Sequence, residues 1–207
     1  MISKLILSAL ALSAVATAAD APVSTDSPTN VEYVAQFDQL NTNITGEVTF
    51  QSNNGTVMVK VDFEELPKTG GPFPYHIHQF PVPSDGNCTG TGGHLNPYNG
   101  TLNATTSAAK QVGDLAGKHG NLTSSPFMAE YFDDYLSLNP KNPAYIGGLS
   151  VVIHDRNDNR LACANITTVK NFQQNTSSSS TMPSAANLVS TSGLVLGAAA
   201  GVAALLI

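Results

Sequence analysis

Alternation of apolar and polar side chains is the dominant pattern in the middle of this chain. At residues 56–63, valine and phenylalanine occupy every second position, and threonine, methionine, lysine and aspartate fall between them. This period of two residues is typical of a β-strand that buries one face. Further strands are predicted at residues 31–37, 44–50, 75–80, 135–138, 145–153 and 161–169. Since no long stretch has the period of an amphipathic helix, the pattern predicts an all-β fold, an antiparallel β-barrel or β-sandwich.

The two ends of the chain differ from the middle. Residues 1–18 combine a lysine, an apolar run and a small-residue Ala-Thr-Ala sequence, which together predict a secretory signal peptide. Residues 193–207 are apolar and uncharged, and they follow a Ser/Thr-rich spacer at residues 171–192. This order is typical of a GPI-anchor signal, and Ser184 is the expected attachment residue. The alternative, a retained membrane helix, is disfavoured because the apolar run is short for a bilayer core of about 30 Å.

Composition agrees with an exported protein of one domain, which we expect at residues 19–170. The formal net charge is −6, with no tryptophan and no basic cluster, so a nucleic-acid-binding function is excluded. In an oxidising compartment the two cysteines, Cys88 and Cys163, are expected to form a disulfide. Eight N-x-S/T sequons predict a partly glycosylated surface. They lie at Asn43, Asn54, Asn87, Asn99, Asn103, Asn121, Asn165 and Asn175.

Four of the five histidines are candidates for a single metal site. His76 and His78 are separated by one residue in a predicted strand, so their side chains point to the same face. His94 follows a Gly-Gly pair, and His154 ends the apolar run at residues 149–153. Neutral imidazole is a suitable ligand for copper, zinc, iron or nickel. The alternative is a set of unrelated surface or hydrogen-bonded histidines, but the His-x-His pair with two further histidines favours a metal site.

The order of these motifs resembles that of the copper/zinc superoxide dismutases over about residues 30–168. The segments that carry the resemblance are Gly-Pro-Phe-Pro-Tyr-His-Ile-His at 71–78, Gly-Gly-His-Leu-Asn-Pro at 92–97, Val-Gly-Asp-Leu at 112–115, Gly-Gly-Leu-Ser-Val-Val-Ile-His at 147–154 and Arg-Leu-Ala-Cys at 160–163. The chain is most similar to the fungal, copper-only, cell-surface branch of that family, which is GPI-anchored. The resemblance implies a Greek-key β-barrel and an extracellular enzyme that converts superoxide to oxygen and hydrogen peroxide.

The resemblance also implies roles for individual residues. The copper ligands would be His76, His78, His94 and His154, and the disulfide would join Cys88 to Cys163. Arg160 would bind and orient superoxide, which suits a side chain that stays protonated at any relevant pH. The alternative for Arg160 is a solvated loop cation.

Two departures from the copper/zinc pattern change the expected site. Gln111 stands where a zinc-ligating histidine is expected, and no histidine lies between His94 and Asp114. Because too few ligands remain for a tetrahedral site, zinc is predicted to be absent. Asp114 and Gln111 are instead expected to hold the copper ligands in place by hydrogen bonds, although Asp114 could equally be a turn residue. Only five residues separate His154 from Arg160, so the long electrostatic loop is missing and an open copper site is expected.

The fifth histidine and two further cations also have expected roles. His119 is expected to have a structural role, whereas Lys118 and Arg156 are candidates for adding positive charge near the site. A monomer is predicted. The main alternative function is a non-enzymatic copper-binding protein of the cell wall, which would need the histidines but not Arg160. A cupin-type site fits poorly because no glutamate follows the His-x-His pair, and blue copper requires a free cysteine.

Overall fold

The computed structural model describes residues 20–38 and 43–169 of the 207-residue chain. The predicted signal peptide, the spacer with Ser184, the sequon at Asn175 and the terminal apolar segment lie outside the described residues. Among the residues that are described, no helix is long and apolar enough to cross a membrane.

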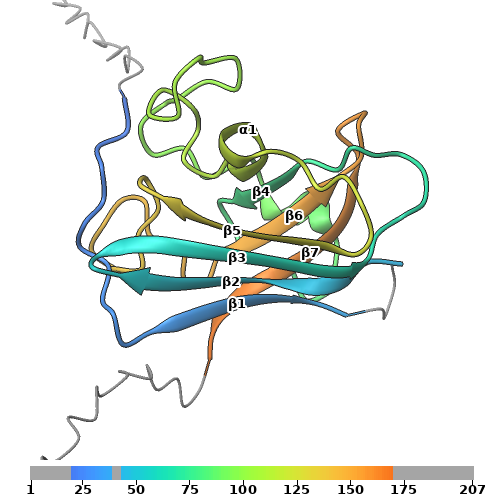
Figure 1. The fold of residues 1–207 in the computed structure, drawn as a ribbon, viewed down its shortest axis with the longest axis horizontal. Helices are drawn as coiled ribbons and strands as arrows, with labels where there is room; N and C mark the ends of the chain where they lie inside the picture. The colour runs from blue at the N-terminus through green and yellow to red at the C-terminus, as the bar shows by residue number, and fades with distance from the viewer. Residues whose placement is uncertain (1–19, 39–42, 170–207) are drawn as a thin grey trace, which may run out of the picture. The chain divides into compact units, whose positions relative to one another are not determined.

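Seven strands form one antiparallel sheet that curls into a half-barrel (Figure 1). The strands are β1 (Glu32–Phe37), β2 (Thr45–Asn53), β3 (Thr56–Glu65), β4 (Tyr75–His78), β5 (Phe127–Asp133), β6 (Ser150–His154) and β7 (Arg160–Thr168). Their order across the sheet is β4-β6-β7-β1-β2-β3-β5, and all neighbouring strands run antiparallel. The last strand therefore returns to lie beside the first, as in a Greek-key connection. The predicted all-β class is confirmed.

The core lies inside the curl of this sheet, and the period-two pattern explains it. In β3, Val57, Val59, Val61 and Phe63 are all fully buried, whereas the residues between them are partly or largely exposed. Burial of each such side chain contributes roughly 1.5–3 kcal/mol. Because alternate residues of a strand point to opposite faces, a shift of register by one residue would expose this whole set, so the pattern specifies the pairing.

The strand expected at residues 135–138 was misplaced. The structure has β5 at Phe127–Asp133 instead, where Phe127, Ala129 and Tyr131 face inward between exposed neighbours. Residues 134 and 135 form a turn, and the backbone N–H groups of residues 135 and 136 donate to the carboxylate of Asp133. Leu136 and Leu138 are buried, but they lie outside the strands of the sheet, on either side of Ser137, which forms an isolated bridge to Tyr145.

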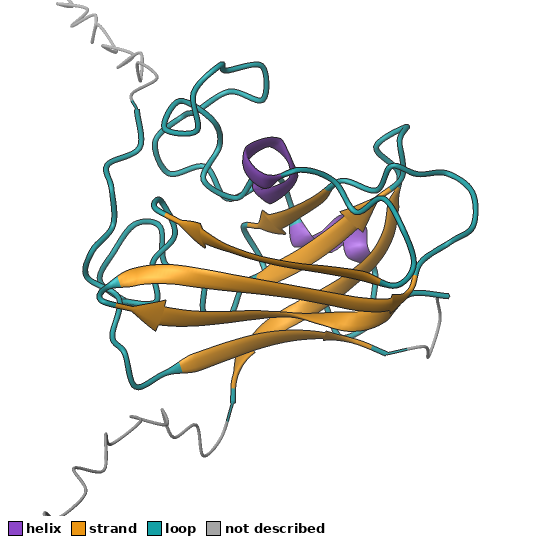
Figure 2. Cartoon of the chain, viewed as in Figure 1, coloured by secondary structure: helices purple, strands orange, loops and turns teal. Residues whose placement is uncertain are grey.

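Strands β4 and β6 are shorter than expected and lie where long loops cross the sheet, whereas β7 lies within one residue of its predicted bounds. Strands β4 and β6 are buried at every position, because loops cover what would otherwise be an exposed face (Figure 2). These loops contain the short elements η1 (Cys88–Thr91, a 3-10 turn) and α1 (Leu115–His119). The chemistry predicted from the sequence is concentrated at this covered edge.

Candidate metal centre

The four histidines predicted to share a site converge in the structure. One ring nitrogen from each of them lies within 4.8 Å of the others, in a group formed by His76, His78, His94 and His154. His76, His78 and His154 are buried, and His94 is half-buried. Bonds from imidazole nitrogen to first-row divalent metals are about 2.0–2.1 Å long, so four nitrogens at this separation can share one ion after small movements.

Two neighbouring strands supply three of these side chains. His76 and His78 lie on β4, which pairs with β6, and His154 is the last residue of β6. The pairing of β6 with β7 is irregular between Ile153 and His154, where the partner of His154 is Arg160. Such bulges commonly redirect side chains next to functional sites. His154 and Arg160 consequently line the same open pocket.

Backbone hydrogen bonds bring the fourth histidine alongside β4. Leu95 donates to Ile77 at 2.8 Å, Gly113 donates to Leu95 at 2.8 Å, and Ile77 donates to Gly113 at 2.9 Å. A Cβ at Gly113 would lie 2.2 Å from the Ile77 carbonyl oxygen, so only glycine allows this approach. The closed set of three bonds fixes His94, which directly precedes Leu95.

Three of the rings have one nitrogen held by an oxygen acceptor. Nδ1 of His78 lies 2.9 Å from the carbonyl of Gly92, and Nδ1 of His94 lies 2.7 Å from Oε1 of Gln111. Nδ1 of His154 lies 2.9 Å from a carboxylate oxygen of Asp158. Because these oxygens accept, the Nδ1 atoms donate, and the Nε2 lone pairs are left for another partner. The Nε2 atoms of His78 and His154 face each other at 3.3 Å.

His76 is held differently from the other three. Its Nε2 lies 3.6 Å from Oδ1 of Asp114, and its Nδ1 is buried without a hydrogen-bond partner among the described residues. An unpaired buried ring nitrogen is costly, and a metal ion would satisfy it. The donor set therefore fits a metal that prefers imidazole.

Burial favours the neutral form of three of these rings, those of His76, His78 and His154. It lowers the pKa of His76 to about 2 and that of His78 to about 3, and the neighbouring histidines add to both shifts. Burial also lowers the pKa of His154. A metal ligand must be unprotonated, so the site is ready to bind a cation over the physiological range.

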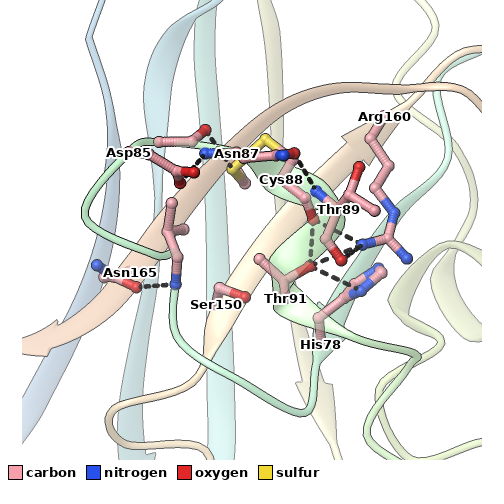
Figure 3. The surroundings of a disulfide bond; sticks show 12 residues. His78, Asp85, Asn87, Cys88, Thr89, Thr91, Ser150, Arg160 and Asn165 are labelled. Atoms are coloured by element: carbon pink, nitrogen blue, oxygen red, sulfur yellow. Dashed lines mark hydrogen bonds between the residues drawn. A yellow bond between two sulfur atoms is a disulfide. The ribbon is translucent and has the colours of Figure 1, made fainter.

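The predicted disulfide is present and borders the site (Figure 3). It joins Cys88 of η1 to Cys163 of β7, with a Cα–Cα distance of 5.6 Å. The guanidinium of Arg160 lies over η1 and donates to the carbonyl oxygens of Cys88 at 2.6 Å and Gly92 at 2.6 Å. A further bond reaches the carbonyl of Thr89. Arg160 is thus a fixed positive charge at the wall of the pocket.

Asp114 and Gln111 have separate partners. Asp114 is buried, caps α1 by accepting from the N–H of Gly117 at 2.8 Å, and faces His76. Gln111 is the residue that contacts His94. Both residues were expected to hold copper ligands in place, and each lies against a different histidine.

The structure places Lys118, His119 and Arg156 outside the pocket. Lys118 does not add charge near the pocket, because its buried ammonium lies 2.6 Å from the buried carboxylate of Asp133. His119 also binds Asp133, at 2.8 Å, and stacks on Tyr131, in agreement with a structural role. Arg156 is exposed and lines a different groove from Arg160.

Three residues near the site were not identified from the sequence. Thr91 lies between Arg160 and His78, Asp158 contacts His154, and Asp133 anchors α1. Their partners are distant in sequence or lie across a turn, and no local pattern marks them.

Comparison with known proteins agrees with this geometry. The family model described as copper/zinc superoxide dismutase matches residues 44–181. Cell surface superoxide dismutase (Cu-Zn) 4 of Candida albicans is 52% identical over 165 residues, covering 79% of this chain and 71% of that protein. Cell surface Cu-only superoxide dismutase 5 of the same organism is 53% identical over 163 residues, covering 78% and 72%.

A solved structure is also similar. Superoxide dismutase 5 of Candida albicans with Cu(II) superposes with a TM-score of 0.67 at 51% sequence identity, covering 70% of this chain and 97% of that one. With a matching family model and relatives above half identity, the chain belongs to the copper/zinc superoxide dismutase family.

Proposed function

We propose that this protein is a cell-surface superoxide dismutase that works with one copper ion and without zinc. The copper would be held by His76, His78, His94 and His154. The observation that carries the proposal is the buried Nδ1 of His76, partnerless among the described residues, beside ring nitrogens of the three other histidines. The relatives named above, two cell-surface superoxide dismutases of which one is Cu-only, support the same reaction and location.

Copper bound there would supply one-electron redox chemistry, by which one superoxide is oxidised to oxygen and a second is reduced and takes up two protons to give hydrogen peroxide. The protein's own contribution is binding and orientation. Arg160 offers guanidinium N–H groups beside His78 and His154 at the pocket, where a small anion needs positive charge. This local charge matters because the protein is net acidic, with a formal charge of −6, and would not attract an anion over a long range.

The absence of zinc is part of the proposal. Gln111 occupies Nδ1 of His94, the nitrogen that would otherwise be available to a second metal. One carboxylate oxygen of Asp114 accepts a hydrogen bond from the N–H of Gly117 at the start of α1, and the carboxylate faces His76. Within the described residues, the set of four histidines is the one group of three or more histidine, cysteine or acidic side chains whose ligand atoms come together. The hydrogen bond that Gln111 accepts from His94, together with the carboxylate of Asp114 beside His76, would thus do the positioning that a second metal would do.

Attachment to the membrane or cell wall through a GPI anchor, at or near Ser184, is likewise proposed, as are a monomeric state and glycosylation of the exposed sequons. The anchor proposal rests on the terminal apolar segment and the Ser/Thr-rich spacer, and the glycosylation proposal rests on the N-x-S/T sequons. Release of the protein from cells by a phosphatidylinositol-specific phospholipase would test the anchor, and mass spectrometry of the released protein would identify the attachment residue.

Metal analysis and superoxide-consumption assays on the secreted domain test the main proposal. We expect one copper per chain, negligible zinc, and full activity with copper alone. Activity that returns only with copper and zinc together would overturn the zinc-free part.

A copper-binding protein without catalysis is the remaining alternative, and Arg160 distinguishes it. Arg160→Met is expected to lower turnover by at least about tenfold while copper affinity is retained. Arg156→Met is the matched control, because Arg156 is exposed and lies outside the pocket. Equal turnover in both variants would favour the binding protein.

A further inference from the structure

The hydroxyl of Thr91 connects Arg160 to one of the proposed copper ligands. Thr91 is the last residue of η1 and is fully buried. Its Oγ1 lies 3.0 Å from Nη1 of Arg160, 3.1 Å from Nδ1 of His78 and 2.7 Å from the carbonyl oxygen of Cys88. Figure 3 shows Thr91 between the two side chains, with its hydroxyl directed toward both.

The chemistry of the neighbours determines the direction of each hydrogen bond. A carbonyl can only accept, so the single hydroxyl proton of Thr91 goes to Cys88. A guanidinium can only donate, so Arg160 takes one lone pair of the hydroxyl oxygen. Nδ1 of His78 also donates when Nε2 is the metal-binding nitrogen, and its proton is shared between Gly92 and the second lone pair of Thr91. The proton and both lone pairs of the hydroxyl then have partners.

We infer that Thr91 is a positioning residue that fixes the anion-binding guanidinium of Arg160 relative to the copper ligand His78. This inference rests on the proposed function. Without the hydroxyl, Arg160 keeps its carbonyl acceptors in η1 and His78 keeps Gly92, so the site still assembles. What is lost is the shared oxygen that ties the two groups together. Small-anion binding should therefore weaken, while copper retention should not.

Azide, a small monoanion that binds metal ions, is the probe. Copper-loaded protein is titrated with azide and followed by Cu(II) electron paramagnetic resonance. Thr91→Val keeps the shape but removes the hydroxyl, and it is expected to weaken azide binding by about tenfold with copper affinity unchanged. Thr91→Ser restores the hydroxyl and should bind azide within about twofold of wild type. Thr69→Val, at an exposed threonine outside the pocket, is the control.

A double-mutant cycle separates positioning from packing. If Thr91 acts through Arg160, Thr91→Val should change azide affinity by less than about twofold in an Arg160→Met background. Wild-type azide affinity in Thr91→Val, or the same loss in both backgrounds, would overturn the inference. Superoxide turnover of the wild type is measured in parallel. If Thr91 and Arg160 are coupled in azide binding but the protein does not turn over superoxide, only the proposed function is overturned. If the protein turns over superoxide but the two residues are not coupled, only this inference is overturned. Wild-type protein that retains no copper overturns both.

Discussion

Gln111 and His94 are joined by a hydrogen bond of 2.7 Å between Oε1 of the amide and Nδ1 of the ring. An amide oxygen can only accept, so Nδ1 of His94 carries a proton and Nε2 is the nitrogen left for a metal. One uncharged residue thus sets both the tautomer and the orientation of a proposed copper ligand that comes from a loop rather than from a strand.

Replacing Gln111 with leucine should therefore impair the site. Leucine has a similar size but no acceptor, so the ring of His94 would be free to rotate, and turnover should fall by about 10- to 100-fold. Gln111→Glu keeps an acceptor and should retain turnover within about threefold. Initial rates of superoxide consumption and Cu(II) spectra of both variants provide the measurement. Unchanged activity in the leucine variant would show that His94 needs no support from Gln111.

A fall in pH should destabilise the metal-free protein at pH values well above the range in which carboxylates titrate. Folded His76 and His78 have pKa values of about 2 and 3, whereas the unfolded chain has the ordinary value of 6.5. Between these values the unfolded state binds more protons, so the free energy of unfolding decreases as the pH falls below 6.5. Each such histidine contributes up to about 1.4 kcal/mol per pH unit.

Thermal unfolding of the metal-free protein between about pH 7 and pH 5 measures this effect. The pKa of Asp133 is also lowered, but its ordinary value of 3.8 places its contribution at more acidic pH. A double variant, His76→Leu with His78→Leu, should have a flatter profile in this window. An identical slope in that variant would assign the pH dependence to other groups.

The buried ion pair of Lys118 and Asp133 should be sensitive to the loss of one partner. Burial alone would raise the pKa of Asp133, but the hydrogen bond from His119 and the charge of Lys118 hold it below its usual value. Asp133→Asn leaves the ammonium buried without a counter-ion, at an expected cost of about 3–5 kcal/mol. Asp134→Asn, at the exposed neighbour, should cost less than about 0.5 kcal/mol. Urea unfolding of the two variants compares them, and equal stabilities would contradict the prediction.

Loss of the disulfide should affect both stability and the position of Arg160. The bond closes a loop of 75 residues, so replacing Cys88 and Cys163 with serine should cost about 4 kcal/mol in the chain-entropy description. It should also loosen η1, whose carbonyls hold Arg160, and lower turnover more than copper retention. A reductant should have the same effect on wild type and none on the serine variant. Full turnover in the serine variant would show that η1 is held without the disulfide.

Local pattern was enough to predict much of this protein. Alternation of side chains identified β1, β2 and β3 because a strand buries every second residue, and that signal is present in any short window. The spacing of His76 and His78 implied a shared face for the same reason. Motif order then indicated His94, His154 and the pairing of Cys88 with Cys163, and the structure brings these groups together.

Contacts between distant segments required the folded chain. The strand near residue 130 was misplaced because apolar residues continue past Asp133, beyond the end of β5. The carboxylate of Asp133, and not a neighbouring strand, accepts the N–H groups of Tyr135 and Leu136. From the sequence alone, Lys118 is indistinguishable from a surface cation. Its ion pair with Asp133 forms because the folded chain places β5 against α1. Thr91 gains its two side-chain partners from β4 and β7, 13 and 69 residues away. Such hydrogen bonds depend on three-dimensional proximity, which no local sequence pattern encodes.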